Sequence, residues 1–276
     1  MSVSINSESP QILARIYSLY RDYFDLAEKK RRWRLRDDIP WHQVSNAVAP
    51  EIADVVQTFC SVEMYLPDYL SKLIPQVRAV RGRAWFLANW GYEESKHSLG
   101  FGDWLLRSGH RSEEEMADME GEVFAQEWDL PYGSAKGMVI YTMLQERATW
   151  VSYRKVKAIV NGACPALDRV LHYISIDECA HYDFFRKLVQ IYLEDDRDET
   201  LEQMRRVVNT FAMPAMHLLA DGRQRTARVQ ELRVFDYDIF FNKVFQPVLK
   251  DLGLTNHDLR QRNSKREIMA VGYSPS

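Results

Sequence analysis

The sequence predicts an all-α protein, built as a four-helix bundle with additional flanking helices. Apolar residues recur three and four positions apart, as at Ile12, Ile16, Tyr20 and Phe24, and the alternation typical of strands is absent. A pair of long segments is also repeated, with the same acidic and histidine residues at matching positions. The length of 276 residues and the hydrophobic content of 46% suit a single domain over residues 1–276.

Prolines, glycines and short turns mark the ends of most expected helices. Where such residues are missing, the helix is expected from the regular spacing of its apolar residues. In chain order, helices are expected near 9–31, 50–77, 81–107, 112–128, 134–161, 165–193, 198–219 and 224–250. The boundaries are Ile39-Pro40, Ala49-Pro50, Ser108-Gly109, Pro131-Tyr132-Gly133, Asn161-Gly162 and Cys164-Pro165. Segment 134–161 is apolar on most of its circumference, which places it in the bundle centre. The polar ends, 1–8 and about 259–276, are expected to be loosely held tails.

Composition excludes several classes of protein. A formal net charge of −3 gives no signature of nucleic-acid binding, and no run of 18 apolar residues predicts a membrane span. Met1 to Pro10 has neither a basic nor an apolar region of a secretory signal, so a cytoplasmic location is expected. The three scattered cysteines, Cys60, Cys164 and Cys179, suit a reducing compartment and are read as small core residues.

The repeated feature is a single glutamate followed 31 or 32 residues later by a Glu-x-x-His unit. The first copy is Glu63 with Glu94-Ser95-Lys96-His97, and the second is Glu146 with Glu178-Cys179-Ala180-His181. Positions i and i+3 share a helix face, so the Glu and His of one unit can bind one metal, with the two single carboxylates able to bridge. Oxygen and imidazole ligands suit iron or manganese. One such unit alone is more often a solvated surface pair, but the common register of all six residues predicts a ferritin-like two-metal bundle.

Three segments and a tryptophan also carry a family resemblance. They are Trp90-Gly91-Tyr92-Glu93-Glu94-Ser95-Lys96-His97, Gln145-Glu146-Arg147-Ala148-Thr149, Asp177-Glu178-Cys179-Ala180-His181, and Trp33 with Asp37, Ile39 and Pro40. Over roughly residues 10–250 the chain resembles the soluble acyl–acyl-carrier-protein desaturases, a ferritin-like di-iron family that includes plant stearoyl desaturase and bacterial relatives. The resemblance implies that the ligands of two iron ions are Glu63, Glu94, His97, Glu146, Glu178 and His181.

The resemblance assigns further roles around these ligands. Thr149 is implied to deliver protons to bound oxygen, and it shares a helix face with Glu146; the alternative is a hydroxyl bonded to its own helix carbonyl. Trp33, Asp177 and His97 are implied to form an electron route, and the alternative for Trp33 is core or dimer packing. Glu93 corresponds to Asp177 by repeat symmetry, and metal-bound imidazoles usually donate to such carboxylates.

The substrate positions implied by the resemblance are Trp90, Gln145 and Ser152, which would line an acyl channel; by pattern alone, a tryptophan at this spacing is more often plain core. One departure from the family concerns Cys179 and Ala180, which replace two basic residues that help to dock the electron donor in the plant enzyme. Donor binding is therefore expected to differ in this chain.

The expected function is oxygen-dependent desaturation of an acyl chain held by an acyl carrier protein, with electrons from a ferredoxin-type donor, in a homodimer. Carriers and ferredoxins are acidic, and two basic groups are candidates to receive them. One comprises Lys29, Lys30, Arg31, Arg32, Arg34 and Arg36; the other comprises Arg225 and Arg228, with Arg233 farther round the same expected helix. The alternative for each is an ordinary solvated helix face.

Two other functions fit the same scaffold. The first is an oxygenase that hydroxylates a carrier-tethered or free substrate. The second is ferritin-like iron oxidation or storage, which the extra helices and the desaturase-type segments disfavour.

Overall fold

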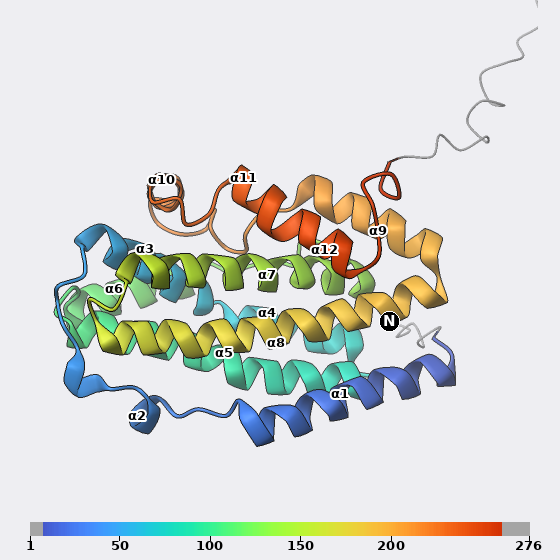
Figure 1. Ribbon diagram of the computed structural model, residues 1–276, viewed down its shortest axis with the longest axis horizontal. Coiled ribbons are helices and arrows are strands. Elements are labelled where there is room, and N and C mark those ends of the chain that lie inside the picture. Colours follow the sequence, from blue (N-terminus) through green and yellow to red (C-terminus); the bar gives the residue numbers. More distant parts are fainter. Residues whose placement is uncertain (1–7, 261–276) are drawn as a thin grey trace, which may run out of the picture.

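The computed structural model describes residues 8–260, and within them the chain is all helical (Figure 1). The expected loose tails lie almost entirely outside these residues. The helices are α1 (Pro10–Lys30), α2 (Leu35–Asp38), the 3₁₀ helix η1 (Trp41–Gln43), α3 (Pro50–Glu63), α4 (Leu66–Val77), α5 (Arg81–Arg107), α6 (Glu113–Phe124), α7 (Ala135–Val160), α8 (Pro165–Asp195), α9 (Arg197–Thr210), α10 (Gly222–Glu231), α11 (Tyr237–Ile239), the π-helix η2 (Phe240–Phe245) and α12 (Gln246–Asp251).

Helices α3, α5, α7 and α8 form the central bundle. Helices α7 and α8 pack side by side, α3 packs on α5, and α5 also contacts α8. Helix α1 covers α5 and α8, while α9 and η2 cover α7 (Figure 1). The expected all-α architecture, a four-helix bundle with flanking helices, is confirmed.

The expectation of one helix over 50–77 is wrong, because the chain breaks between α3 and α4. Helix α3 ends at Glu63, and Pro67 is the second residue of the next helix. A proline at position 67 has no N–H for the carbonyl of Glu63, four residues before it, and its ring clashes with that carbonyl. The break leaves Glu63 at a helix terminus that faces the bundle centre.

The last two expected helices are also interrupted, the first of them ahead of a proline. Helix α9 stops at Thr210 instead of 219, four residues before Pro214. The expected helix 224–250 divides into α10, α11, η2 and α12. Pro247 cannot bond the carbonyl of Lys243, which instead accepts a hydrogen bond from Arg147 Nε at 3.0 Å.

Other boundaries follow local capping. Helix α6 starts with a capping box, in which Ser112 and Glu115 bond each other's backbone N–H, and it ends at Phe124 instead of 128. Helix α7 begins with the N-cap Ser134 and ends at Asn161, which is left-handed at φ 44°. Among the helices of residues 8–260, none has both the length and the apolarity needed to cross a bilayer.

Candidate metal centre

Six side chains from four helices meet in the middle of the bundle. They form two groups, within each of which the potential ligand atoms lie within 4.8 Å of one another: Glu63, Glu94, His97 and Glu178 in the first, and Glu94, Glu146, Glu178 and His181 in the second. All six are buried, and none exposes more than 6% of its surface. The structure therefore brings together every residue of the six-member set that the sequence pattern selected.

The two groups share Glu94 and Glu178, which are the glutamates of the Glu-x-x-His units. Glu63 and Glu146 each belong to only one group. The expectation that the two single glutamates bridge is therefore wrong for this geometry. A carboxylate has two oxygens, so Glu94 and Glu178 are the residues that two bound metal ions would share.

Both histidines present Nδ1 to the centre of the cluster. His97 Nδ1 lies 3.3 Å from Glu94 Oε2 and 3.4 Å from Glu178 Oε1. His181 Nδ1 lies 2.8 Å from Glu94 Oε1 and 3.1 Å from Glu146 Oε2. Each ring therefore turns its Nε2 outward.

A second pair of carboxylates receives these outward nitrogens. His181 Nε2 lies 2.9 Å from Glu93 Oε2, and His97 Nε2 lies 3.6 Å from Asp177 Oδ2. Trp33 Nε1 donates to the same Asp177 oxygen at 2.7 Å. Trp33 thus contacts Asp177, and Asp177 contacts His97, as expected for this series. Glu93 contacts His181 in the same way that Asp177 contacts His97, as the repeat symmetry predicted.

The electrostatics of the cluster are those of a crowded acidic site. Burial and the neighbouring carboxylates raise the pKa of Glu63 and Glu146 well above the ordinary value. Burial opposes the charge of Glu94, but His97 and His181 outweigh it and lower its pKa. Burial likewise disfavours charged histidines, yet the surrounding carboxylates raise the pKa of His97 and His181 well above the ordinary value. Without cations, the cluster therefore holds protons in their place.

The donor set fits two metal ions. His97 Nδ1 and Glu146 Oε1 are buried, and neither has a hydrogen-bond partner among residues 8–260. Buried polar atoms of this kind are rare unless an ion or water completes them. Four carboxylates and two imidazoles suit iron or manganese. The buried groups therefore fit a two-metal site.

Two hydroxyl groups of α7 contact the cluster. Thr149 Oγ1 lies 2.8 Å from Glu178 Oε2, and it is also 3.1 Å from the carbonyl of Gln145 and 3.0 Å from that of Glu146. A hydroxyl donates one proton at a time, so the cluster contact and the helix contact alternate for Thr149. Tyr153, which the sequence analysis did not select, donates to Glu63.

An apolar cavity of about 860 Å³ opens beside these hydroxyls. Thr149, Ser152 and Tyr153 line it from α7, and Phe59 and Val62 line it from α3. The remaining wall comes from the segment between α9 and η2, namely Phe211, Ala212, Met213, Met216, His217, Gly222, Arg223, Thr226, Ala227, Val229, Gln230, Phe235, Asp236, Tyr237 and Phe240. The apolar period did not predict this wall, because it indicated continuous helices there; Pro214 is the residue that signals the break.

The three expected substrate positions differ in placement. Ser152 lines the cavity, although its hydroxyl bonds the carbonyl of Ala148 at 2.8 Å. Gln145 is half-buried and does not line the cavity. Trp90 is 2% exposed and packs edge-on against His181, with ring centroids 6.4 Å apart. The cavity therefore does not support a channel-lining role for Trp90 or Gln145.

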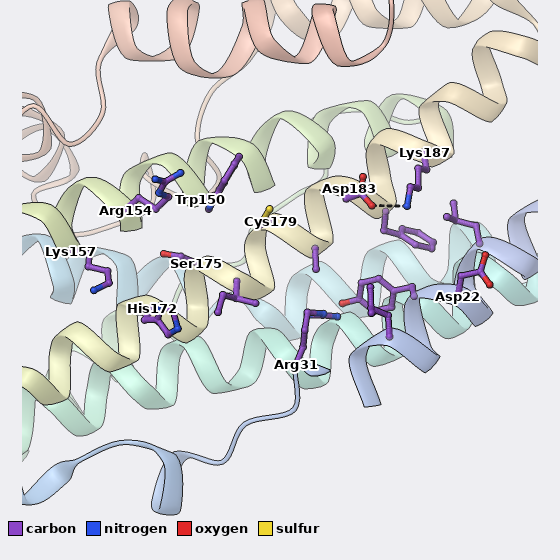
Figure 2. A pocket seen from close by; sticks show the side chains of 16 residues that line it. Asp22, Arg31, Trp150, Arg154, Lys157, His172, Ser175, Cys179, Asp183 and Lys187 are labelled. Atoms are coloured by element: carbon purple, nitrogen blue, oxygen red, sulfur yellow. Dashed lines mark ion pairs between the residues drawn. The ribbon is translucent and has the colours of Figure 1, made fainter. Parts of the chain in front are cut away.

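A second hollow, an open groove of about 760 Å³, lies between α1, α7 and α8 (Figure 2). Trp150 and Arg154 line it from α7, Cys179 lines it from α8, and Arg31 reaches it from the end of α1. Burial raises the pKa of the Cys179 thiol, which disfavours the reactive thiolate. The other two cysteines are fully buried, as expected for core residues.

The first basic group is divided between the surface and the interior. The side chains of Arg31 and Arg32 are 8% and 23% exposed and pair with buried acidic residues. The other four members, Lys29, Lys30, Arg34 and Arg36, are exposed.

The second basic group is also less open than expected. Arg225 Nη1 donates to Thr58 Oγ1 at 3.3 Å, and Arg228 Nη1 lies 3.1 Å from Glu231 Oε2. Arg233 lies beyond the end of α10, so its expected place on the same helix is wrong.

The helical bundle and its buried cluster of carboxylates and imidazoles fit the class of ferritin-like two-metal proteins. Residues 26–265 match the model of the family described as fatty acid desaturase, and the chain belongs to this family. It is similar to the chloroplastic stearoyl-[acyl-carrier-protein] 9-desaturase 6 of Arabidopsis thaliana, with 33% identity over 107 residues. That match covers 36% of this chain and 27% of the plant protein. The resemblance to acyl–acyl-carrier-protein desaturases is thereby confirmed, and the family supports an oxidoreductase.

Solved structures show the same fold. DesA2 of Mycobacterium tuberculosis H37Rv, assigned as an acyl-ACP desaturase, has a TM-score of 0.67 at 16% identity, covering 93% of this chain and 98% of its own. A mutant of an R2-like ligand-binding oxidase with an anaerobically reconstituted Mn/Fe cofactor has a TM-score of 0.55 at 16% identity, covering 91% of this chain and 96% of its own. These likenesses confirm the ferritin-like fold.

Proposed function

We propose that the protein is an oxygen-dependent di-iron desaturase that introduces a double bond into an acyl chain bound to a carrier protein. The observation that carries this proposal is the contact between cavity and cluster. Thr149 lines the apolar cavity and also lies 2.8 Å from Glu178 Oε2. A chain held in this cavity therefore runs beside the residues that fit two metal ions.

The reaction removes two hydrogens from adjacent carbons of an unactivated chain, which no side chain does alone. Two bound irons would supply the oxidising chemistry, in which one dioxygen, two electrons and two protons become two waters as the chain loses two hydrogens. Glu63, Glu94, His97, Glu146, Glu178 and His181 would hold the irons. The protein's own contribution is orientation: the apolar wall fixes the chain, and the Thr149 hydroxyl is placed to pass a proton toward the centre.

A carrier-bound substrate is supported by the residues at the cavity wall formed by α10. Arg223 is exposed and lines the cavity, so it is placed to receive an acidic carrier whose acyl arm enters there. Arg228 is less suitable because Glu231 already neutralises part of its charge. Arg223, and not the expected group of Arg225, Arg228 and Arg233, is therefore the proposed contact for the carrier protein.

The electrons would come from a ferredoxin-type donor. The groove between α1, α7 and α8 supports docking on that side, because Arg154 is exposed at its edge and Arg31 links it to Asp177. Asp177 in turn contacts His97 and Trp33. This side of the molecule thus offers a short series of contacting polar side chains that leads to the cluster.

The decisive experiment is turnover by the purified protein, reconstituted with ferrous iron, on a series of acyl carrier proteins with reduced ferredoxin and its reductase. Mass spectrometry should show products that have lost two hydrogens. A gain of one oxygen atom would indicate the oxygenase instead, and iron uptake without product would indicate oxidation or storage. Glu146→Ala and His181→Ala should each lower the iron content per chain, because each removes a donor that no neighbour replaces.

Carrier recognition has its own test. Arg223→Glu should weaken carrier binding about tenfold or more, since like charges across an interface repel. Arg78→Glu, at an exposed position that caps α4, is the matched control and should leave binding unchanged. Equal affinity of both variants, or equal turnover of free and carrier-bound acyl chains, would contradict the carrier assignment.

A further inference from the structure

Two arginines at the end of α1 bond the carboxylates that surround the cluster. Arg31 Nη1 donates to Asp177 Oδ1 at 2.9 Å, and its Nη2 lies 3.5 Å from Glu93 Oε1. Arg32 Nη1 donates to the same Glu93 oxygen. Arg31 can be followed in Figure 2, where it extends from the end of α1 beside α8. The two residues that directly follow α1 therefore reach both outer carboxylates.

Those two carboxylates are the groups that contact the outward nitrogens of the histidines. Asp177 and Glu93 are each 1% exposed, so both side chains are shielded from solvent water. Each of the two acids instead forms an ion pair with a guanidinium group at the end of α1, so the partners of these buried carboxylates are protein groups.

The charged groups lie in two layers. In the outer layer, Arg31 and Arg32 face the two buried acids Asp177 and Glu93, and Arg32 also pairs with the exposed Glu28. The inner layer has four glutamates, which match two divalent cations. Lys96 lies nearby, but its ammonium contacts the rings of Trp33 and Tyr92 instead of a carboxylate, and burial lowers its pKa.

We infer that Arg31 and Arg32 are positioning residues that set the charge around the metal centre and so hold its metals toward the divalent state. This inference rests on the proposed function and adds the residues that govern the reduction potential. A positive charge in a buried layer disfavours the more positive, oxidised centre. Removing one guanidinium leaves an uncompensated carboxylate beside a histidine, which stabilises the oxidised centre and lowers the potential.

The test measures iron content and midpoint potential in the iron-reconstituted protein, by titration with mediators followed by electron paramagnetic resonance. Arg31→Gln and Arg32→Gln should retain two irons and show potentials more negative than the wild type. The shift should be larger for Arg31→Gln, because Arg31 contacts both acids. Arg31→Lys keeps the charge and should shift the potential less.

The matched control is Arg34→Gln, three positions along the chain, where the side chain is 71% exposed and pairs only with Asp37 and Asp38 among the described residues. Its potential should equal that of the wild type. An unchanged potential in Arg31→Gln and Arg32→Gln, even with lower thermal stability, would overturn the inference and leave a structural role. Arg32 is nearer the surface, so its replacement is less disruptive to the fold. If Arg31→Gln does not fold, the midpoint potential of Arg32→Gln tests the inference by itself. A wild type that binds fewer than two irons would contradict the proposed function instead.

Discussion

The contacts of Thr149 place one hydroxyl between the cavity and the cluster. Its oxygen reaches Glu178 and two helix carbonyls at similar distances, so both interpretations of the residue, functional and structural, are open to it. Its neighbour Ser152 also lines the cavity, but bonds only a helix carbonyl. The two hydroxyls therefore form a natural pair for comparison.

Replacing Thr149 by valine should preserve iron content and acyl binding, because valine has the same shape. Product formation should fall about 100-fold, the lower end of what a positioned proton donor contributes, while oxygen consumption continues. Ser152→Ala should leave the ratio of product to oxygen consumed unchanged. The ratio is measured with an oxygen electrode and product mass spectrometry. Equal ratios in the two variants would remove Thr149 from the proton path.

The protonation of the cluster gives a dependence of stability on pH. Burial and neighbouring acids raise the pKa of Glu63 and Glu146, and carboxylates raise the pKa of His97 and His181. The folded metal-free centre therefore binds more protons than the unfolded chain above about pH 4.3, so its unfolding free energy falls as the pH rises through the neutral range.

Metal binding should reverse this trend, because the ligands release their protons to the solvent when a cation replaces them. Urea unfolding at about pH 6 and about pH 8 should show the metal-free protein more stable at the lower pH and the stabilisation by metal larger at the higher pH. A metal-free protein that gains stability between these two values would contradict the raised pKa values.

At the scale of helices, the breaks in the chain shape the site. Pro67 ends α3 at Glu63, and Pro214 ends α9 at Thr210. The second break releases residues 211–221 to form a wall of the cavity, which a continuous helix over 198–219 does not provide. The two interruptions of helical structure therefore lie next to the cluster and at the cavity wall.

The position of α1 depends on a close crossing with α5. A Cβ added at Gly82 would lie 2.7 Å from the carbonyl oxygen of Ile16, a backbone atom that cannot move by itself. Gly82→Ala should therefore destabilise the fold by about 1–3 kcal/mol, as overpacking does. Gly121→Ala, in α6 with nothing within 4 Å, should stabilise it by about 0.5–1 kcal/mol. Denaturant unfolding measures both, and a neutral Gly82→Ala would show that α1 adjusts freely.

At the scale of the molecule, α5 carries an apolar stripe on its outer side. Trp85, Tyr92, Leu99 and Leu106 are 48%, 56%, 57% and 38% exposed and follow each other at seven-residue intervals. This spacing keeps them on one side of the helix over about 31 Å. We propose that two copies of the chain pair through this stripe about a two-fold axis, with the α5 helices antiparallel.

A charge in the middle of the stripe should separate the copies. Leu99→Glu is expected to convert the dimer to a monomer, whereas Ile159→Glu, at an exposed position 44% accessible on α7, should leave it intact. Light scattering gives the masses, with one chain at 32.4 kDa. A wild-type protein with the mass of one chain, or a dimeric Leu99→Glu variant, would refute this interface.

The sequence by itself determined the helical architecture and the six side chains that meet in the bundle. Both are consequences of local periodicity: apolar spacing selects helices, and positions i and i+3 place Glu94 with His97 on one face of a helix. The repeat then required the second unit to occupy the equivalent face. The contact of Trp33 with Asp177 followed from resemblance, not from spacing.

Only the tertiary structure decided which carboxylates are shared, where the cavity lies and which way Arg31 points. Sharing of Glu94 and Glu178 depends on the angles at which four helices cross, and the cavity depends on segments far apart in sequence. From the sequence alone, a basic run such as residues 29–32 indicates a solvated surface. The partner of each side chain is known only from the tertiary structure. Arg31 and Arg32 face inward because α5 and α8 bring buried acids against the end of α1, and pairing compensates those charges where water is excluded.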